Sequence, residues 1–225
     1  HEAVACGWAG LSRAPDSAAL LAALANILHV QGRNDEAETL YRRAIALHPD
    51  LPTAHTNLGS LLRARGEAAA AIAAHRQALA LRPDYPEALS NLGYALLATP
   101  SALTEAESLL RRAVALRPEM IEGWSNLGLI LQYQGRVSEA EKIYRTLLTT
   151  APNHSYTLNN LGISLSNQGR FSEAIDVYRQ ALAVDPNNPL PNTNLLFALN
   201  YQWPSDRAMV FAEHQAWNMR FGQAA

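Results

Sequence analysis

Apolar and small residues recur along the chain with helical spacing, and the pattern itself repeats about every 34 residues. A Leu-Gly pair marks four copies, and two alanine positions and a proline recur in the second half of five copies. The glycines are Gly59, Gly93, Gly128 and Gly162; the alanines are Ala37, Ala71, Ala106, Ala140 and Ala174, then Ala44, Ala78, Ala113 and Ala181, with Leu147 replacing one; the prolines are Pro49, Pro83, Pro118, Pro152 and Pro186. Ala and Leu favour helix, so the pattern predicts an all-α chain of paired helices.

The repeat divides the chain into five full units with a partial unit at each end. The full units are 18–51, 52–85, 86–120, 121–154 and 155–188. Residues 1–17 are interpreted as a degenerate partial repeat or capping segment. Residues 189–225 are interpreted as a partial repeat and a C-terminal helix leading towards a missing downstream domain. The third unit has one extra residue and Pro100 in place of a glycine, which predicts a lengthened turn around Thr99–Ser101.

Glycines and short polar residues predict where the helices of each unit end and begin. Gly32, Gly66, Gly135 and Gly169 lie where the first helix should end, because glycine tolerates the left-handed conformation of a helix C-terminus. Asp35, Ser138 and Ser172 lie near the start of the second helix, where their side chains are expected to cap free N–H groups.

This pattern resembles the tetratricopeptide repeat (TPR). One nearly complete copy of the family pattern consists of Trp124, Leu127, Gly128, Leu131, Gly135, Ala140, Tyr144 and Pro152. The resemblance implies a right-handed TPR superhelix, an α-solenoid of about five full helix pairs plus partial terminal repeats. It also implies that the chain is a protein-binding module.

An asparagine recurs at the sixth position of successive units, on the first helix. The five residues are Asn57, Asn91, Asn126, Asn160 and Asn194. Helical geometry places this position opposite the core side, on the face that lines the concave groove in this fold. A side-chain amide both donates and accepts hydrogen bonds, so a row of amides could grip an extended polypeptide. The alternative is that these are neutral polar residues on a solvated face, or copies left by duplication.

Apolar residues are also expected to line the groove and to contribute to peptide binding. They are Tyr94, Leu129, Tyr133, Tyr156 and Ile163. These side chains would dominate if the chain were instead a stand-alone TPR scaffold that docks a folded partner or an amphipathic helix.

The asparagine row resembles that of the O-linked N-acetylglucosamine transferases. The segment Asn194–Tyr201, with Phe211 and Trp217 after it, looks like the junction to the catalytic domain in bacterial members of that family and in SPINDLY-like proteins. The resemblance implies that this fragment is the acceptor-recognition arm of a protein O-glycosyltransferase and is not itself an enzyme. His214 is interpreted as a packing or junction residue, and no catalytic residue is assigned.

Composition narrows the classes of partner. The formal net charge is -2 and Lys142 is the only lysine, which argues against nucleic-acid binding. No apolar stretch is long enough to span a membrane, and no signal peptide is recognised, so a cytoplasmic location is expected. The single Cys6 fits a reducing compartment.

No metal or cofactor is expected, because the histidines lack partners at ligand spacing. His55 and His75 are interpreted as core substitutes for aromatic residues that could meet within their repeat. The series Arg42, Arg76, Arg111, Arg145 and Arg179 is interpreted as long side chains covering the outer helices. Formation of a homo-oligomer is left open.

Overall fold

The computed structural model describes residues 2–202 and 207–222. Within these ranges it has thirteen α-helices, two short 3-10 helices and no strand, so the predicted all-α class is confirmed. The chain divides into two compact units, His1–Gly123 (unit 1) and Trp124–Ala225 (unit 2), with the boundary inside α8.

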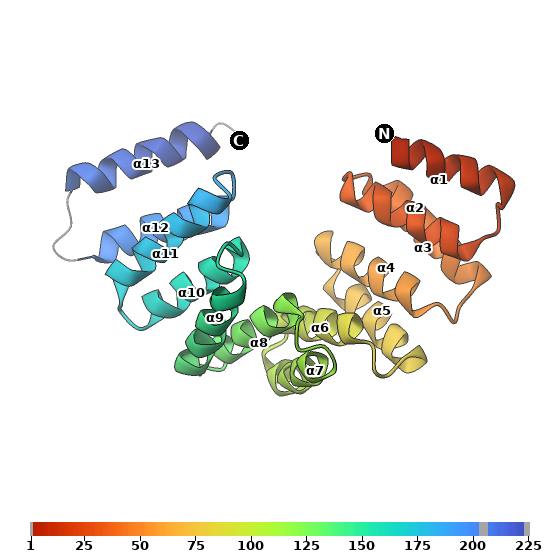
Figure 1. Cartoon of the computed structure of the whole chain (residues 1–225), viewed down its shortest axis with the longest axis horizontal. Helices are drawn as coiled ribbons and strands as arrows, with labels where there is room; N and C mark the ends of the chain where they lie inside the picture. The colour runs from red at the N-terminus through yellow and green to blue at the C-terminus, as the bar shows by residue number, and fades with distance from the viewer. Residues whose placement is uncertain (1, 203–206, 223–225) are drawn as a thin grey trace. The chain divides into compact units, whose positions relative to one another are not determined.

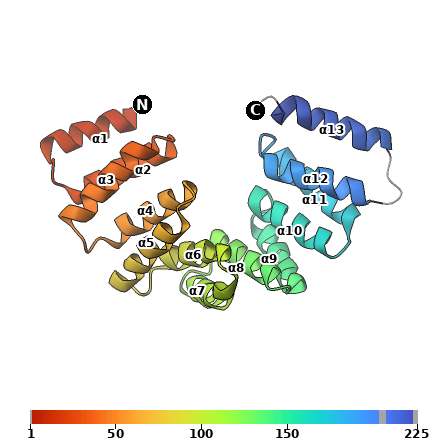
Figure 2. The ribbon, with the colours of Figure 1, turned by 180° about the vertical axis from the view of Figure 1, so that it is seen from behind.

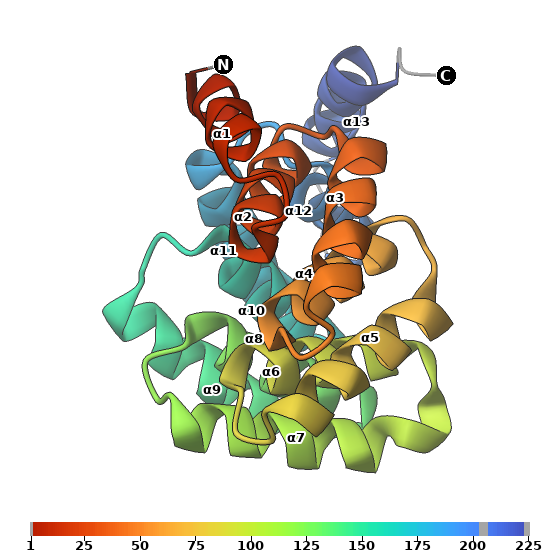
Figure 3. The same cartoon turned by 90° about the vertical axis from the view of Figure 1, so that its right-hand side faces the viewer.

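Unit 1 contains α1 to α7 (Figure 1). The bounds are α1 Glu2–Arg13, α2 Ala18–Val30, α3 Asn34–Leu47, α4 Pro52–Ala64, α5 Ala68–Leu81, α6 Pro86–Ala95, η1 Leu96–Ala98, η2 Pro100–Ala102 and α7 Leu103–Leu116. Helices α2 and α3, α4 and α5, and α6 and α7 pack as pairs (Figure 3). Because α2 also contacts α4, and α4 contacts α6, the first helices of successive pairs lie side by side.

Unit 2 repeats this arrangement (Figure 2). The bounds are α8 Ile121–Tyr133, α9 Val137–Thr150, α10 Ser155–Asn167, α11 Phe171–Val184, α12 Pro189–Tyr201 and α13 Arg207–Phe221. Helix α10 packs against α9, α11 and α12, and α13 packs against α12. The even-numbered helices from α2 to α12 are called A helices below, and the odd-numbered helices from α3 to α11 are called B helices.

The Leu-Gly pair lets the two helices of a pair approach closely. A Cβ added to Gly128 would lie 2.6 Å from Cε1 of Tyr144, and one added to Gly162 would lie 2.3 Å from Cε1 of Tyr178. Both tyrosine rings are buried against the glycine backbone. Any larger residue at these glycines would therefore have to displace an aromatic ring from the core.

The predicted turns are confirmed. Gly32, Gly66, Gly135 and Gly169 have φ values of 76°, 82°, 79° and 74°. The third pair, which lacks this glycine, turns through η1 and η2 on either side of Thr99.

The predicted capping of the B helices is wrong. The N-cap residues of α3, α9 and α11 are Arg33, Arg136 and Arg170, and no side chain caps these helices. The turn is so short that each arginine N–H still closes the preceding A helix, as Arg33 N donates to Leu28 O at 2.9 Å. The arginine side chain instead pairs with a glutamate three residues later, as Arg33 does with Glu36 at 2.7 Å.

Candidate peptide-binding face of the A helices

The sixth-position asparagines connect successive A helices. In unit 1, Asn57 Nδ2 donates to Asn26 Oδ1 at 2.8 Å, and Asn91 Nδ2 donates to Ser60 Oγ at 3.2 Å. In unit 2, Asn194 Nδ2 donates to Asn159 Oδ1 at 2.9 Å. Asn57, Asn91 and Asn194 are partly exposed residues, so each is anchored to the preceding helix at a position that solvent still reaches.

Asn160 differs from these three residues because it is only 3% exposed. Its Oδ1 accepts from Asn159 Nδ2 at 3.4 Å, and its backbone oxygen accepts from Gln132 Nε2 at 3.1 Å. Its Nδ2 is buried without a hydrogen-bond partner. In unit 1 the acceptor lies 31 residues earlier, as Asn26 does for Asn57. The equivalent residue for Asn160 is Leu129, which has no acceptor on its side chain.

A chain of buried polar groups therefore crosses unit 2. Tyr144 OH donates to Gln132 Oε1 at 2.9 Å, and Gln132 continues the chain to Asn160. Burial raises the pKa of Tyr144, and the neighbouring Tyr156 adds to the shift, so the phenol remains a neutral donor. This network fixes α8, α9 and α10 to one another within unit 2. Asn126, the remaining member of the row, is partly exposed on α8.

The apolar residues expected in the groove lie on the A helices with different exposures. Tyr94 is partly buried, and the Arg63 guanidinium lies 4.8 Å above its ring. Leu129, Ile163 and Tyr156 are also partly exposed. Tyr133, at the end of α8, is 64% exposed.

Sequence reasoning missed an apolar stripe on α12. Leu190, Phe197 and Tyr201 are 61%, 53% and 59% exposed. The Phe197 and Tyr201 rings lie 4.6 Å apart, and Phe171 stacks on Tyr201 at 5.6 Å. The sequence pattern could have revealed this stripe. The three residues occupy positions two, nine and thirteen of the partial repeat at 189–201, which lie on the side of the helix expected to line the groove.

Charge is concentrated away from the A helices of unit 2. Residues 124–133, 155–167 and 189–201 contain no Asp, Glu, Lys or Arg. The periodic arginines of the B helices pair with glutamates, at distances from 2.8 to 3.9 Å. The pairs are Arg42 with Glu38, Arg76 with Glu105, Arg111 with Glu107, Arg145 with Glu141, and Arg179 with Glu213.

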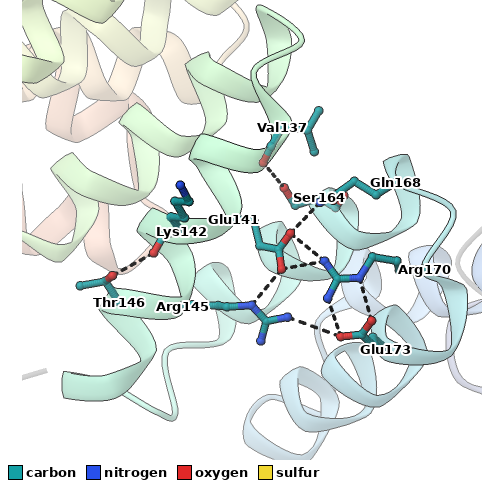
Figure 4. Close-up of polar contacts among 9 residues, drawn as sticks. All are labelled: Val137, Glu141, Lys142, Arg145, Thr146, Ser164, Gln168, Arg170 and Glu173. Carbon is teal, nitrogen blue, oxygen red and sulfur yellow. Dashed lines mark hydrogen bonds and ion pairs between the residues drawn. The ribbon is translucent and has the colours of Figure 1, made fainter.

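Glu141 is the centre of an ion-pair cluster in unit 2 (Figure 4). It accepts hydrogen bonds from Arg145 at 2.9 Å, Arg170 at 2.8 Å and Gln168 at 2.7 Å. Burial alone would raise the pKa of Glu141, but hydrogen bonds from Gln168, Arg145 and Arg170 lower it to about 2. Glu173 joins the cluster by pairing with Arg170 at 2.6 Å. The cluster links α9 to α11 and to the turn before it.

The two histidines of the second repeat have different surroundings. His75 is fully buried, and neither ring nitrogen has a hydrogen-bond partner. Burial, with a smaller effect from the charge of Arg63, lowers the pKa of His75 to about 4. His55 is partly exposed, and its Nε2 lies 2.9 Å from the Pro49 carbonyl oxygen. His75 thus occupies the core position that Tyr41, Tyr144 and Tyr178 occupy in other pairs.

Within the part of the chain that the structure describes, no three His, Cys, Asp or Glu side chains are grouped to hold a metal ion. Over the same residues, no helix combines the length and apolar character needed to cross a membrane.

Solved structures with the same fold include several TPR proteins. Cut9–Hcn1, a hetero-tetramer of the APC/C, matches with a TM-score of 0.85 and 17% identity over 96% of this chain and 42% of that chain. TTC0263, a thermophilic TPR protein from Thermus thermophilus, matches with a TM-score of 0.72 and 23% identity, covering 81% and 99% of the two chains. YrrB matches with a TM-score of 0.58 and 20% identity, covering 82% and 95%. These identities establish the fold alone.

No curated protein matches the chain. A family model does match, over residues 3–219, and it describes the C-terminal domain of cilia and flagella-associated protein 70. The match spans both units and all five helix pairs. The chain therefore belongs to this family of TPR domains.

Proposed function

We propose that the chain binds an extended polypeptide segment along its A helices, through the sixth-position asparagines. The observation that carries this proposal is the anchoring of Asn57, Asn91 and Asn194 to the preceding A helix while they remain partly exposed. An amide that donates one N–H to its neighbour keeps a second N–H and an oxygen lone pair. Because its orientation is already fixed, it loses little conformational entropy when it binds a peptide backbone.

The class of function follows from the fold and the solved structures. TPR domains typically act as non-catalytic interaction modules. YrrB is described as a TPR protein with an unusual peptide-binding site, and Cut9 is found in an assembly with Hcn1. We therefore assign to the chain a protein-binding role of the kind that is typical of non-catalytic TPR modules.

A pair of variants separates recognition from structure. Asn91→Ala removes both the amide and its bond to Ser60, whereas Ser60→Ala keeps the amide and removes the hydroxyl, which accepts from Asn91 and itself donates to Thr56 O at 3.2 Å. Both variants should lose a similar amount of stability, about 1 kcal/mol. If the amide grips peptide, a fluorescence-polarisation titration will show a larger loss of affinity for Asn91→Ala, which has no amide, than for Ser60→Ala, which only releases the amide from its anchor. Equal affinity in the two variants would reject the role of the asparagine row.

A second candidate, helix-in-groove docking, is favoured by the exposure of Tyr133 at the end of α8. Binding of an amphipathic helix depends on its anchor side chains, whereas binding through the asparagines depends on the peptide backbone. Exchanging the side chains of a bound peptide should abolish the first mode, whereas the second should keep the part of its affinity that the peptide backbone provides. Tyr133→Ala should weaken the first mode more strongly than Asn91→Ala does.

Service as the acceptor-recognition arm of a protein O-glycosyltransferase stays a prediction from the sequence resemblance. The family match and the solved structures do not bear on it. Reading the gene beyond the codon for Ala225 provides the test. A following two-lobed α/β domain would support the arm, and any other continuation would reject it while leaving the peptide-binding proposal intact.

A further inference from the structure

The apolar stripe of α12 is uncovered in the described part of unit 2. Leu190, Asn194, Phe197 and Tyr201 follow one another at helical spacing on one side of the helix. The other sides of α12 bury Leu195, Leu196 and Leu199, and α12 packs against α10, α11 and α13. Two aromatic rings, each more than half exposed, and an exposed leucine therefore flank an anchored amide. Exposed large apolar groups gathered in this way are typical of interaction surfaces.

The distribution of charge indicates what such a surface accepts. Apart from Glu122 in the first turn of α8, the A helices α8, α10 and α12 carry no charged side chain, although the B helices beside them carry several. A Lys, Arg, Asp or Glu of a partner pressed onto the A helices would lose water and find no opposite charge there. Unit 1 differs in this respect, because Arg63 covers the Tyr94 ring on its A-helix face. The exposed side of the A helices in unit 2 therefore favours a partner segment without charged residues.

We infer that the α12 stripe binds an uncharged, extended segment of a partner protein and seats one aromatic side chain of that segment against Phe197 and Tyr201. This inference rests on the proposed peptide-binding function and names the kind of peptide. The stack of Phe171 on Tyr201 holds the tyrosine ring in place, so a partner ring meets a surface that is already ordered. Asn194, between Leu190 and Phe197, hydrogen-bonds the backbone of the same segment.

Selection of short random peptides displayed against the whole 225-residue chain tests this inference. The enriched peptides should contain an aromatic residue and be depleted in charged residues. Replacing that aromatic residue by alanine in a synthetic peptide should weaken binding about tenfold, and placing a Lys or a Glu beside it should each weaken binding. These measurements vary only the peptide, so they do not depend on the folding of any variant.

The protein is varied in parallel. The double variant Phe197→Ala, Tyr201→Ala should lose binding about tenfold or more, because both side chains are exposed and their loss leaves the core intact. Phe211→Ala is the matched control, since Phe211 is an exposed aromatic residue on α13 of the same unit, and it should bind like the parent chain.

The outcomes distinguish this inference from the function on which it rests. Enriched peptides that are charged, or that bind the Phe197 and Tyr201 double variant unchanged, would overturn the inference and leave the proposed function standing. No enrichment against the folded chain would overturn both.

Discussion

His75 gives a test of how far a buried, unpaired polar group weakens this repeat. The ring is fully buried, neither nitrogen is hydrogen-bonded, and Arg63 is the charged group that acts on it. Leu110 occupies the equivalent position in the next pair, so His75→Leu introduces a residue that the fold already uses there. Because a buried unsatisfied polar group costs about 1–3 kcal/mol, this variant should be more stable than the parent near pH 7.

The gain should grow in mild acid. Burial lowers the pKa of His75 from near 6.5 to about 4, so between these values the unfolded chain binds a proton that the folded chain excludes. By linkage, the contribution of His75 to the free energy of unfolding is unaffected above pH 6.5, falls as the pH is lowered, and levels off below about 4. At about pH 5 the cost to the parent chain is about 2 kcal/mol, which His75→Leu removes.

Urea unfolding followed by circular dichroism, near pH 7 and near pH 5, measures both effects. His55→Leu is the control, because His55 is partly exposed and its replacement should leave the pH dependence of the parent chain in place. If the difference in unfolding free energy between His75→Leu and the parent were the same at both pH values, the buried neutral state assigned to His75 would be refuted.

Three further changes test the packing and the polar contacts. Glu141→Gln should lower the unfolding free energy by about 1–3 kcal/mol in urea titrations. This difference from the parent chain should shrink as the pH falls from 4.5 towards about 2, because Glu141 itself becomes protonated there. Gly169→Ala, at φ 74°, should cost about 1 kcal/mol, whereas Gly10→Ala inside α1 should stabilise the chain; equal melting shifts would reject the left-handed turn. Leu129→Asn should provide the missing acceptor for Asn160. A double-mutant cycle with Asn160→Ala should then show a favourable coupling of about 1 kcal/mol in unfolding free energy. No coupling would mean that residue 129 does not face Asn160 as Asn26 faces Asn57.

The repeating units and their turns could be predicted because each depends on residues close together in the sequence. The Leu-Gly pairs and the alanines mark where two neighbouring helices touch, and the four glycines mark a backbone conformation that other residues avoid. The capping of the B helices was predicted wrongly, because the N-cap residue of α3 is also the residue whose N–H closes α2. If the end of α2 and the start of α3 are considered separately, the N-cap is placed at Asp35. In the structure Arg33 serves both helix ends, so the N-cap lies two residues earlier.

The asparagine row shows why register alone does not reveal the role of a residue. Sequence spacing placed the five amides at one position of the repeat, but the partners of Asn57, Asn91 and Asn194 lie 31 to 35 residues away on the neighbouring A helix. Asn26 and Ser60 supply an acceptor to the next asparagine, whereas Leu129 cannot supply one to Asn160. The same residue type is thus a partly exposed, anchored residue in one repeat and a buried, incompletely bonded residue in another. Recognition of a peptide would therefore be unequal along the row: it would depend on Asn57, Asn91 and Asn194, which are anchored and partly exposed, and not on Asn160, which is buried.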